Sequence, residues 1–179
     1  MIVLGIDPGI RGGLAVVSDC GIGTLIDAID IPVVGSGARE RVDVAAVRNF
    51  VRQHQPDLAL IERAQAMPRQ GSSSGFKYGK ATGALEPAIV LSAIPLEIVE
   101  PTAWKRFWKL PPKDKERSRQ RALELFPAAH ALLNLKKHHG RGEAALIALY
   151  GPRNSHAVAP PSGSSMKSEP LDFLGGEQA

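Results

Sequence analysis

Cysteine is almost absent from this 179-residue sequence, and long apolar runs are absent altogether. The single cysteine, Cys20, cannot form an internal disulfide, which indicates a reducing cytosol. No apolar run approaches the ~20 residues that span a bilayer. The N-terminus leads directly into an apolar segment, without the basic and apolar succession of a signal peptide. We therefore expect a cytoplasmic protein that makes no membrane contact.

The length of the chain fits one domain with a substantial core and some excess. After Gly151 the composition changes to Pro, Ser and Gly with few large apolar residues. A segment of this composition cannot bury enough apolar area to offset the entropy of ordering. We expect a folded domain over residues 1–151 and a disordered tail over residues 152–179.

The sequence does contain two apolar stretches that each end in one carboxylate, Asp7 after residues 2–6 and Glu62 after residues 58–61. Stretches of this length, rich in Val, Ile and Leu, are typical of buried strands. An acid at the tip of a buried strand is costly unless a cation or hydrogen bonds compensate it. Two such acids on neighbouring strands meet at one end of the sheet, where they form a site for a hard divalent metal ion. Asp7 and Glu62 are therefore our first candidates for chemistry.

Periodicity and turn residues predict a mixed sheet between two layers of helices. Three successive strands with Gly-rich turns favour an antiparallel meander, after which helices alternate with strands. Expected strands cover residues 2–7, 13–18, 24–31, 58–62 and 95–100. Expected helices cover 41–54, 76–92, 101–110 and 113–126, with a last helix that begins near Arg141. This order gives an α/β domain of the α/β/α kind with a five-stranded mixed sheet.

Positive charge is concentrated in one part of the chain. Residues 101–141 carry eleven Lys or Arg against three acids, although the net charge of the whole chain is only +4. A positive lobe beside an acidic pocket suits a polyanionic substrate that approaches bound metal. A solvated, charged helical face is the alternative explanation.

Within the same segment Trp104, Phe107 and Trp108 form one helical stripe, which indicates a core position for all three.

A third acid, Glu143, stands at the start of an otherwise apolar helix, where the macrodipole tolerates a negative charge. An ordinary helix-start acid is the alternative. His139 precedes it by four residues and shares its helix face if the helix begins that early. Gly140 and Gly142 favour a looser turn there.

Several short motifs occur in order along residues 1–151. They are Asp-Pro-Gly after the first strand, Ile-Glu at the end of an apolar strand, Gln-Gly in the next loop, Glu-Pro-Thr-Ala-Trp-Lys, Leu-Phe-Pro, and Gly-Arg-Gly-Glu-Ala. The set resembles the RuvC-like Holliday junction resolvases of the RNase H-like superfamily, and most closely their phage and chloroplast branch. The resemblance implies an RNase H-like fold and a structure-selective endodeoxyribonuclease that resolves four-way DNA junctions by paired symmetric nicks. It also implies the cytosol of a bacterium or of a phage-infected cell.

The resemblance further implies that acids at the positions of Asp7, Glu62 and Glu143 hold two divalent ions, Mg²⁺ or Mn²⁺. A further ligand of the family, usually Asp, falls where this chain has His139. Lys105, in the Trp-Lys motif, resembles a family lysine near the scissile phosphate, and an ordinary exposed lysine is the alternative. Two ions about 4 Å apart orient a water for in-line attack on a phosphodiester and leave a 5′-phosphate and a 3′-hydroxyl.

Cations and aromatic residues around the loop at 64–75 are candidates for contact with nucleic acid. Their composition suits stacking on unpaired bases, and either Phe76 or Tyr78 is a candidate wedge in the opened centre of a junction. A core position in the following helix is the alternative for each ring. The complete set of expected DNA contacts is Arg69, Gln70, Phe76, Lys77, Tyr78, Lys80, Lys105, Lys115 and Arg141.

The resemblance also leads us to expect a homodimer, because a four-way junction has two-fold symmetry and a dimer presents two equivalent sites to it. Gly79 and Gly83 lie on one helix face and allow another helix to approach, although packing on the sheet is a competing explanation. Other functions stay open: an RNase H-like nuclease that cuts RNA or flaps, and a junction-binding protein with weakened catalysis, for which His139 is the clue. Gly-Ile-Asp-Pro-Gly is also similar to actin-like sugar kinases, but a chain this short lacks their second nucleotide-binding half.

Overall fold

The computed structural model describes residues 1–154 apart from residues 21–22, 66–70 and 113. A five-stranded sheet lies at its centre, with the strands in the spatial order β3-β2-β1-β6-β7. The strands are β1 (Ile2–Asp7), β2 (Gly13–Ser18), β3 (Thr24–Asp30), β6 (Leu58–Glu62) and β7 (Leu96–Val99). β1 to β3 form the predicted antiparallel meander, while β6 and β7 run parallel to β1. The expected mixed sheet is confirmed.

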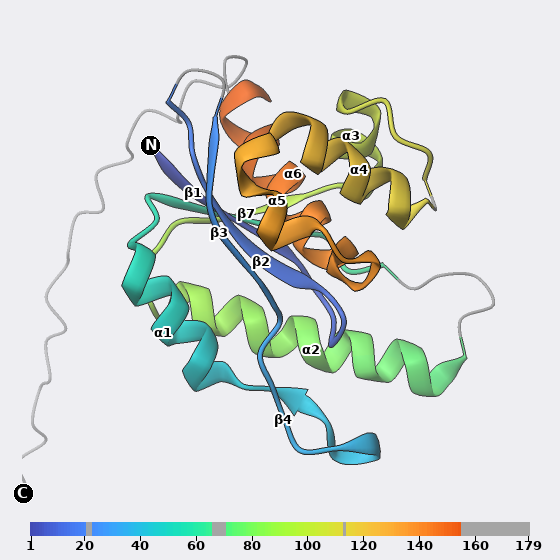
Figure 1. The fold of residues 1–179 in the computed structure, drawn as a ribbon. Helices are drawn as coiled ribbons and strands as arrows, with labels where there is room; N and C mark the ends of the chain where they lie inside the picture. Colours follow the sequence, from blue (N-terminus) through green and yellow to red (C-terminus); the bar gives the residue numbers. More distant parts are fainter. Residues whose placement is uncertain (21–22, 66–70, 113, 155–179) are drawn as a thin grey trace, which may run out of the picture.

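Helices cover both faces of this sheet (Figure 1). One face carries α1 (Val44–His54) and α2 (Ser72–Val90). The other carries α3 (Pro101–Phe107), α4 (Lys115–Leu125), α5 (His130–Leu133) and α6 (His139–Asn154), with short 3₁₀ turns at Pro127–Ala129 and Lys136–His138. The domain therefore has the expected α/β/α layers. No helix among the described residues is long and apolar enough to cross a membrane.

A small hairpin lies between β3 and α1 and was not predicted. It consists of β4 (Val33–Val34) and β5 (Arg41–Val42), joined by a 3₁₀ turn at Gly37–Arg39. The helix expected from residue 41 consequently begins only at Val44. Asp43 sets this start, because its carboxylate accepts a hydrogen bond from the Ala46 N–H at 3.0 Å.

Three other helix boundaries differ from the predictions. α2 begins at Ser72, so part of the expected loop is helical. α3 ends at Phe107, before the prolines that were expected to end it. α6 begins at His139 and continues through Pro152 to Asn154, so the domain limit predicted at residue 151 falls inside a helix. The rest of the predicted tail, from residue 155 on, lies outside the described residues.

The alternation of side chains along β1 decides which face the first acid occupies. Val3 packs into the core beneath α6, whereas Leu4 and Ile6 pack into the core beneath α1 and α2. Successive residues of a strand point to opposite faces, so Asp7 lies on the α6 face with Val3. On β6, Leu60 belongs to the same core and places Glu62 on that face too.

Glycines let α6 lie unusually close to the sheet. A Cβ added to Gly5 of β1 would overlap the backbone of Ala144 and Ala148 in α6, and one added to Gly140 would come within 2.6 Å of Gly12. Gly142 faces α4, where an added Cβ would lie 2.9 Å from the Cα of Arg119. The helix that carries Glu143 is therefore packed backbone to backbone against its neighbours. We expected Gly142 to loosen the start of the helix. Instead, its missing Cβ allows α6 to pack closely on α4.

Candidate active site

Asp7 and Glu62 end neighbouring parallel strands at the same edge of the sheet. Ile6 of β1 is paired with Ile61 of β6, so the two acids follow at the next position of each strand. The side chain of Asp7 is 6% exposed and its Oδ2 is buried with no hydrogen-bond donor among the described residues. Glu62 is half-buried, and its Oε2 accepts a hydrogen bond from the indole Nε1 of Trp104 at 2.8 Å.

Glu143 approaches these acids from α6. It is 4% exposed, and its Oε1 accepts a hydrogen bond from the hydroxyl of buried Ser118 on α4 at 3.2 Å. The same oxygen lies 3.3 Å from Nζ of Lys105. Glu143 is thus held by a neutral donor and a cation, and a simple role as an exposed helix-start acid is excluded.

The Trp-Lys motif connects the two outer acids. Trp104 is fully buried and reaches Glu62, while the next residue, Lys105, reaches Glu143. The Lys105 side chain is 16% exposed and its ammonium also donates to the carbonyl of Pro112 at 3.2 Å. Lys105 is therefore part of the acid cluster. Trp104 was predicted only as a core residue, and its indole N–H adds a polar contact that helical spacing does not reveal.

The pKa values of Asp7 and Glu62 are both raised, in each case mainly by burial. Burial raises the pKa of Asp7 well above its ordinary value, and the negative charges of Glu143 and, less strongly, Glu62 raise it further, while the cations of Lys115 and Lys105 lower it. Burial also raises the pKa of Glu62, partly offset by the hydrogen bond from Trp104. Such shifts are typical of carboxylates gathered for function, because the cluster repels its own charge until a cation compensates it.

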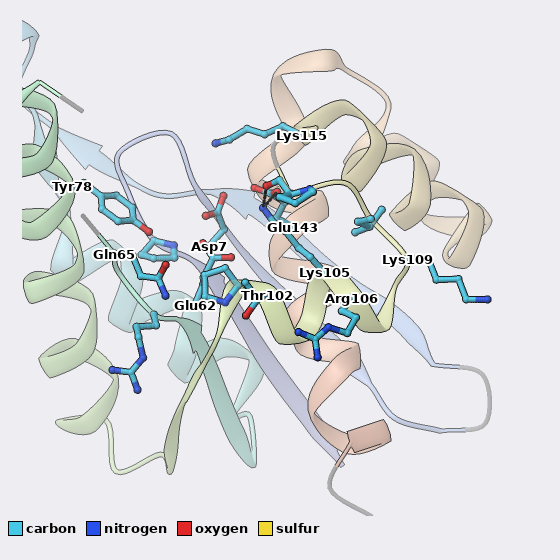
Figure 2. Close-up of a pocket in the computed structure, with 15 residues that line it drawn as sticks. Asp7, Glu62, Gln65, Tyr78, Thr102, Lys105, Arg106, Lys109, Lys115 and Glu143 are labelled. Atoms are coloured by element: carbon cyan, nitrogen blue, oxygen red, sulfur yellow. Dashed lines mark hydrogen bonds and ion pairs between the residues drawn. The ribbon is translucent and has the colours of Figure 1, made fainter. Parts of the chain in front are cut away.

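The acids line a cleft of about 730 Å³ that opens between α2 and the α3–α4 segment (Figure 2). Its basic lining residues are Arg63, Lys105, Arg106, Lys109 and Lys115, and its other polar residues include Gln65, Thr102 and Tyr78. Sequence reasoning missed Arg63, Gln65, Thr102, Arg106 and Lys109 as members of this site. Arg63 directly follows β6, while Thr102, Arg106 and Lys109 belong to the helix and turn after β7. Their positions just after the ends of these two strands are the signal that could have found them.

The structure does not bring His139 into this cleft with Asp7, although α6 starts early enough to place it four residues before Glu143. Its Nδ1 is buried and has no hydrogen-bond partner among the described residues. Burial lowers the pKa of His139, and the cation of Lys115 lowers it further. Among the described residues, no three His, Cys, Asp or Glu side chains are close enough, as they stand, to hold an ion together.

The two candidate wedge residues have different surroundings. Phe76, in the first turns of α2, is 72% exposed, so a core role is excluded for it. Tyr78 is half-buried: it lines the cleft and its ring lies over Gly9, next to the loop that follows Asp7 (Figure 2). Burial and the three carboxylates raise the pKa of its phenol, which therefore stays protonated.

The other expected DNA contacts divide into exposed and engaged cations. Lys77, Lys80 and Lys115 are exposed, while Arg69 and Gln70 lie outside the described residues. Arg141 differs from our expectation, because its guanidinium binds both carboxylate oxygens of Asp30 on β3, at 2.7 and 3.0 Å, and the carbonyl of Leu132. It joins α6 to the sheet, so its guanidinium is already bound within the chain, and its contact with DNA stays a prediction.

The predicted aromatic stripe is buried except at one position. Trp104 and Trp108 belong to the core, and the Trp108 indole donates to the carbonyl of Leu146 at 3.0 Å. Phe107 is 42% exposed and packs edge-on against Trp108 and Tyr150. The prediction of a core position is confirmed for both tryptophans and wrong for Phe107.

Solved structures share this arrangement of strands and helices. The Thermus thermophilus RuvC in complex with a Holliday junction substrate is 22% identical, with a TM-score of 0.64, and the match covers 88% of this chain and 96% of that one. A second T. thermophilus RuvC structure matches over the same shares with a TM-score of 0.61. The yeast mitochondrial Holliday junction resolvase Ydc2 is 16% identical over 82% of this chain and 77% of its own, with a TM-score of 0.50. The fold is therefore the RNase H-like fold of RuvC.

The family follows from a sequence comparison. The sequence model of the family described as crossover junction endodeoxyribonuclease RuvC matches residues 3–107, more than half of the chain. The chain belongs to this family of DNA-acting hydrolases. No curated protein matches it. The expected phage and chloroplast branch is not tested by these matches and stays a prediction.

Proposed function

We propose that this protein resolves four-way DNA junctions by paired symmetric nicks, using divalent metal ions held by Asp7, Glu62 and Glu143. The observation that carries the proposal is the buried Oδ2 of Asp7, which has no hydrogen-bond partner in the described part of the chain and shares its cleft with two further acids. Membership in the RuvC family supports junction resolution as the reaction. The Thermus thermophilus relative binds a Holliday junction substrate, which supports the same class of substrate here.

The donor set of the cleft fits a hard divalent ion. Three carboxylates provide the oxygen ligands that Mg²⁺ and Mn²⁺ prefer, and Asp7 has an oxygen that no described group of the chain satisfies. The ammonium of Lys105 now lies against Glu143, where it offsets part of the negative charge. Divalent ions bound to these acids would supply a nucleophilic water at neutral pH and offset the charge that develops on the leaving 3′ oxygen.

The residues of the chain set the geometry for this chemistry. Trp104 and Ser118 each fix one carboxylate by a hydrogen bond, so Glu62 and Glu143 are oriented before substrate arrives. Lys105 sits beside Glu143 and can pair with a phosphate oxygen that enters the cleft. Hydrolysis needs no covalent enzyme intermediate and leaves a 5′-phosphate and a 3′-hydroxyl.

The outer face of α2 supports the proposal of a homodimer. An added Cβ at Gly79 or Gly83 would meet no described atom within 4 Å, so packing on the sheet does not explain these glycines. Exposed Phe76 and Val90 flank them on the same helix. A second copy of the chain that packs on this face would give the pair of sites that a two-fold symmetric junction requires.

Cleavage of labelled substrates tests the proposal. Purified protein is incubated in Mg²⁺ and in Mn²⁺ with a four-way junction, the duplex of its arms, a flap and an RNA–DNA hybrid, and products are separated on a denaturing gel. We expect symmetric nicks in the junction and little cutting of the others. Faster cutting of the flap or the hybrid would contradict junction resolution, and tight junction binding without cutting in either metal would indicate a binding protein with weakened catalysis.

A further inference from the structure

One residue of the cleft occupies a backbone conformation that disfavours its side chain. Lys109, just after α3, has a φ of 56°, in the left-handed region. It closes a Schellman motif: its N–H bonds to the carbonyl of Arg106 at 3.0 Å, and the N–H of Leu110 bonds to the carbonyl of Lys105 at 2.8 Å. Glycine is the usual residue at this position, because it has no Cβ to crowd the backbone. A lysine there costs stability that a glycine would not.

The contacts of Lys109 within the chain do not explain why a lysine is there. Its side chain is exposed and pairs with no side chain that the structure describes. Figure 2 shows it at the rim of the cleft, with the ammonium directed away from the three carboxylates. The charge is therefore available to a group outside the protein.

Nearby arginines behave differently. On α4, Arg119 is bound by Glu116, and Arg117 and Arg121 share Glu124. These pairs engage three of the eleven cations that the sequence concentrates between residues 101 and 141. Arg106, one turn before Lys109, is exposed, lines the cleft and pairs with no described carboxylate. At the end of α3, the positive charges of Arg106 and Lys109 are thus not paired with a described carboxylate, and both residues line the cleft.

We infer that Lys109 and Arg106 form a phosphate subsite, which binds the DNA backbone a short distance from the carboxylates. Two cations on one rim of an acidic cleft suit consecutive phosphodiesters of a strand whose scissile bond lies at the acids. The strained backbone is then the cost in stability of placing a charged side chain where the strand passes. This inference rests on the proposed function, because it takes DNA as the polyanion.

Three variants separate the strain from the charge. Lys109→Gln removes the charge and keeps the strain, and Lys109→Gly removes both. Gln55→Gly is the matched control: Gln55 is exposed at the end of α1 with a φ of 45°, and it does not line the cleft. Thermal unfolding reports the strain. The slope of log binding constant against log salt, measured with a four-way junction and with duplex, reports phosphate contacts.

We expect Lys109→Gly and Gln55→Gly each to raise Tm by about 2–4 °C, and Lys109→Gln to leave it unchanged. Both Lys109 variants should reduce the salt slope by about 0.9, the value for one lost phosphate contact, while Gln55→Gly should not change it. An unchanged slope in Lys109→Gln, with the wild-type chain still cutting junctions, would overturn the inference alone. Reduced slopes in a chain that cuts no junction would contradict only the proposed function, and absence of DNA binding by the wild-type chain would overturn both.

Discussion

Two helices on opposite faces of the sheet both contain glycines, and the glycines have opposite meanings. In α6, a Cβ at Gly140 would collide with the backbone of the turn before β2, and one at Gly142 with the backbone of α4. In α2, a Cβ at Gly79 or Gly83 would meet no atom of the residues that the structure describes. The close packing of α6 fixes Glu143 against the two acids of the sheet. The open face of α2 leaves room for something outside the chain, either DNA or a second copy.

The largest expected effect breaks the contact between α6 and the sheet. Gly5→Ala places a methyl group inside the backbone of α6, and nothing flexible is there to move. We expect a loss of at least about 3 kcal/mol in the free energy of unfolding, or no folded protein. Gly79→Ala is the control on α2 and should be stabilising by about 0.5–1 kcal/mol, because alanine favours a helix interior. Denaturant unfolding of both variants measures the difference, and equal stabilities would contradict the comparison.

The second effect concerns the acids that this packing brings together. Asp7→Asn and Glu62→Gln should each reduce the single-turnover rate of junction cleavage more than a hundredfold. Binding of the junction should persist, because loss of an acid does not weaken the attraction to phosphate. Glu97→Gln, at an exposed acid of β7, is the control and should cut at the wild-type rate. A loss of less than tenfold in either cleft variant would remove that acid from the proposed site.

The third effect tests the other side of the comparison, at the start of α2. Phe76→Ala should weaken binding of a junction by about 1–3 kcal/mol and binding of plain duplex much less, because stacking is available only where bases are unpaired. Tyr78→Phe keeps the half-buried ring over Gly9 and should change junction binding little. Equal losses on junction and duplex for Phe76→Ala would show that the ring does not stack on opened bases.

The sequence could predict the parts of this site that depend on local pattern. Each acid at the end of an apolar strand was recognisable, because alternation and strand length fix its place in a sheet. The sequence could not reveal that Arg141 bonds to Asp30, since 111 residues separate the two and only the packing of α6 brings them together. For the same reason it missed the contact of Ser118 with Glu143, which lies 25 residues away. The hairpin before α1 is local, but its strands have only two residues each, too few to show an alternating pattern. Contacts between distant elements depend on the assembled core, and local periodicity carries no information about them.

The smallest effect is the cost of gathering the acids, which pH should reveal. The pKa values of Asp7 and Glu62 are raised in the folded chain, and the unfolded chain has the ordinary values of 3.8 and 4.5. Above these values the folded state binds more protons than the unfolded state, so the free energy of unfolding falls as pH rises, until the acids of the folded chain are ionised. We expect Asp7→Asn to flatten this dependence above pH 3.8, the ordinary pKa of Asp7, because the substitution removes one of the two acids whose pKa is raised in the folded chain.

Thermal or denaturant unfolding in EDTA at several pH values measures how the free energy of unfolding depends on pH. Glu97→Gln is the control for the loss of an exposed acid. The comparison of Asp7→Asn with the wild-type chain isolates Asp7, because the other titrating groups are common to both. Added Mg²⁺ or Mn²⁺ should raise the Tm of the wild-type chain at pH 8 and have less effect on Asp7→Asn, because an ion that binds only the folded state stabilises it. The same pH dependence in both proteins would show that neither burial nor the neighbouring acids raise the pKa of Asp7. An equal response to metal would show that it is not a ligand, even if its substitution slowed cleavage.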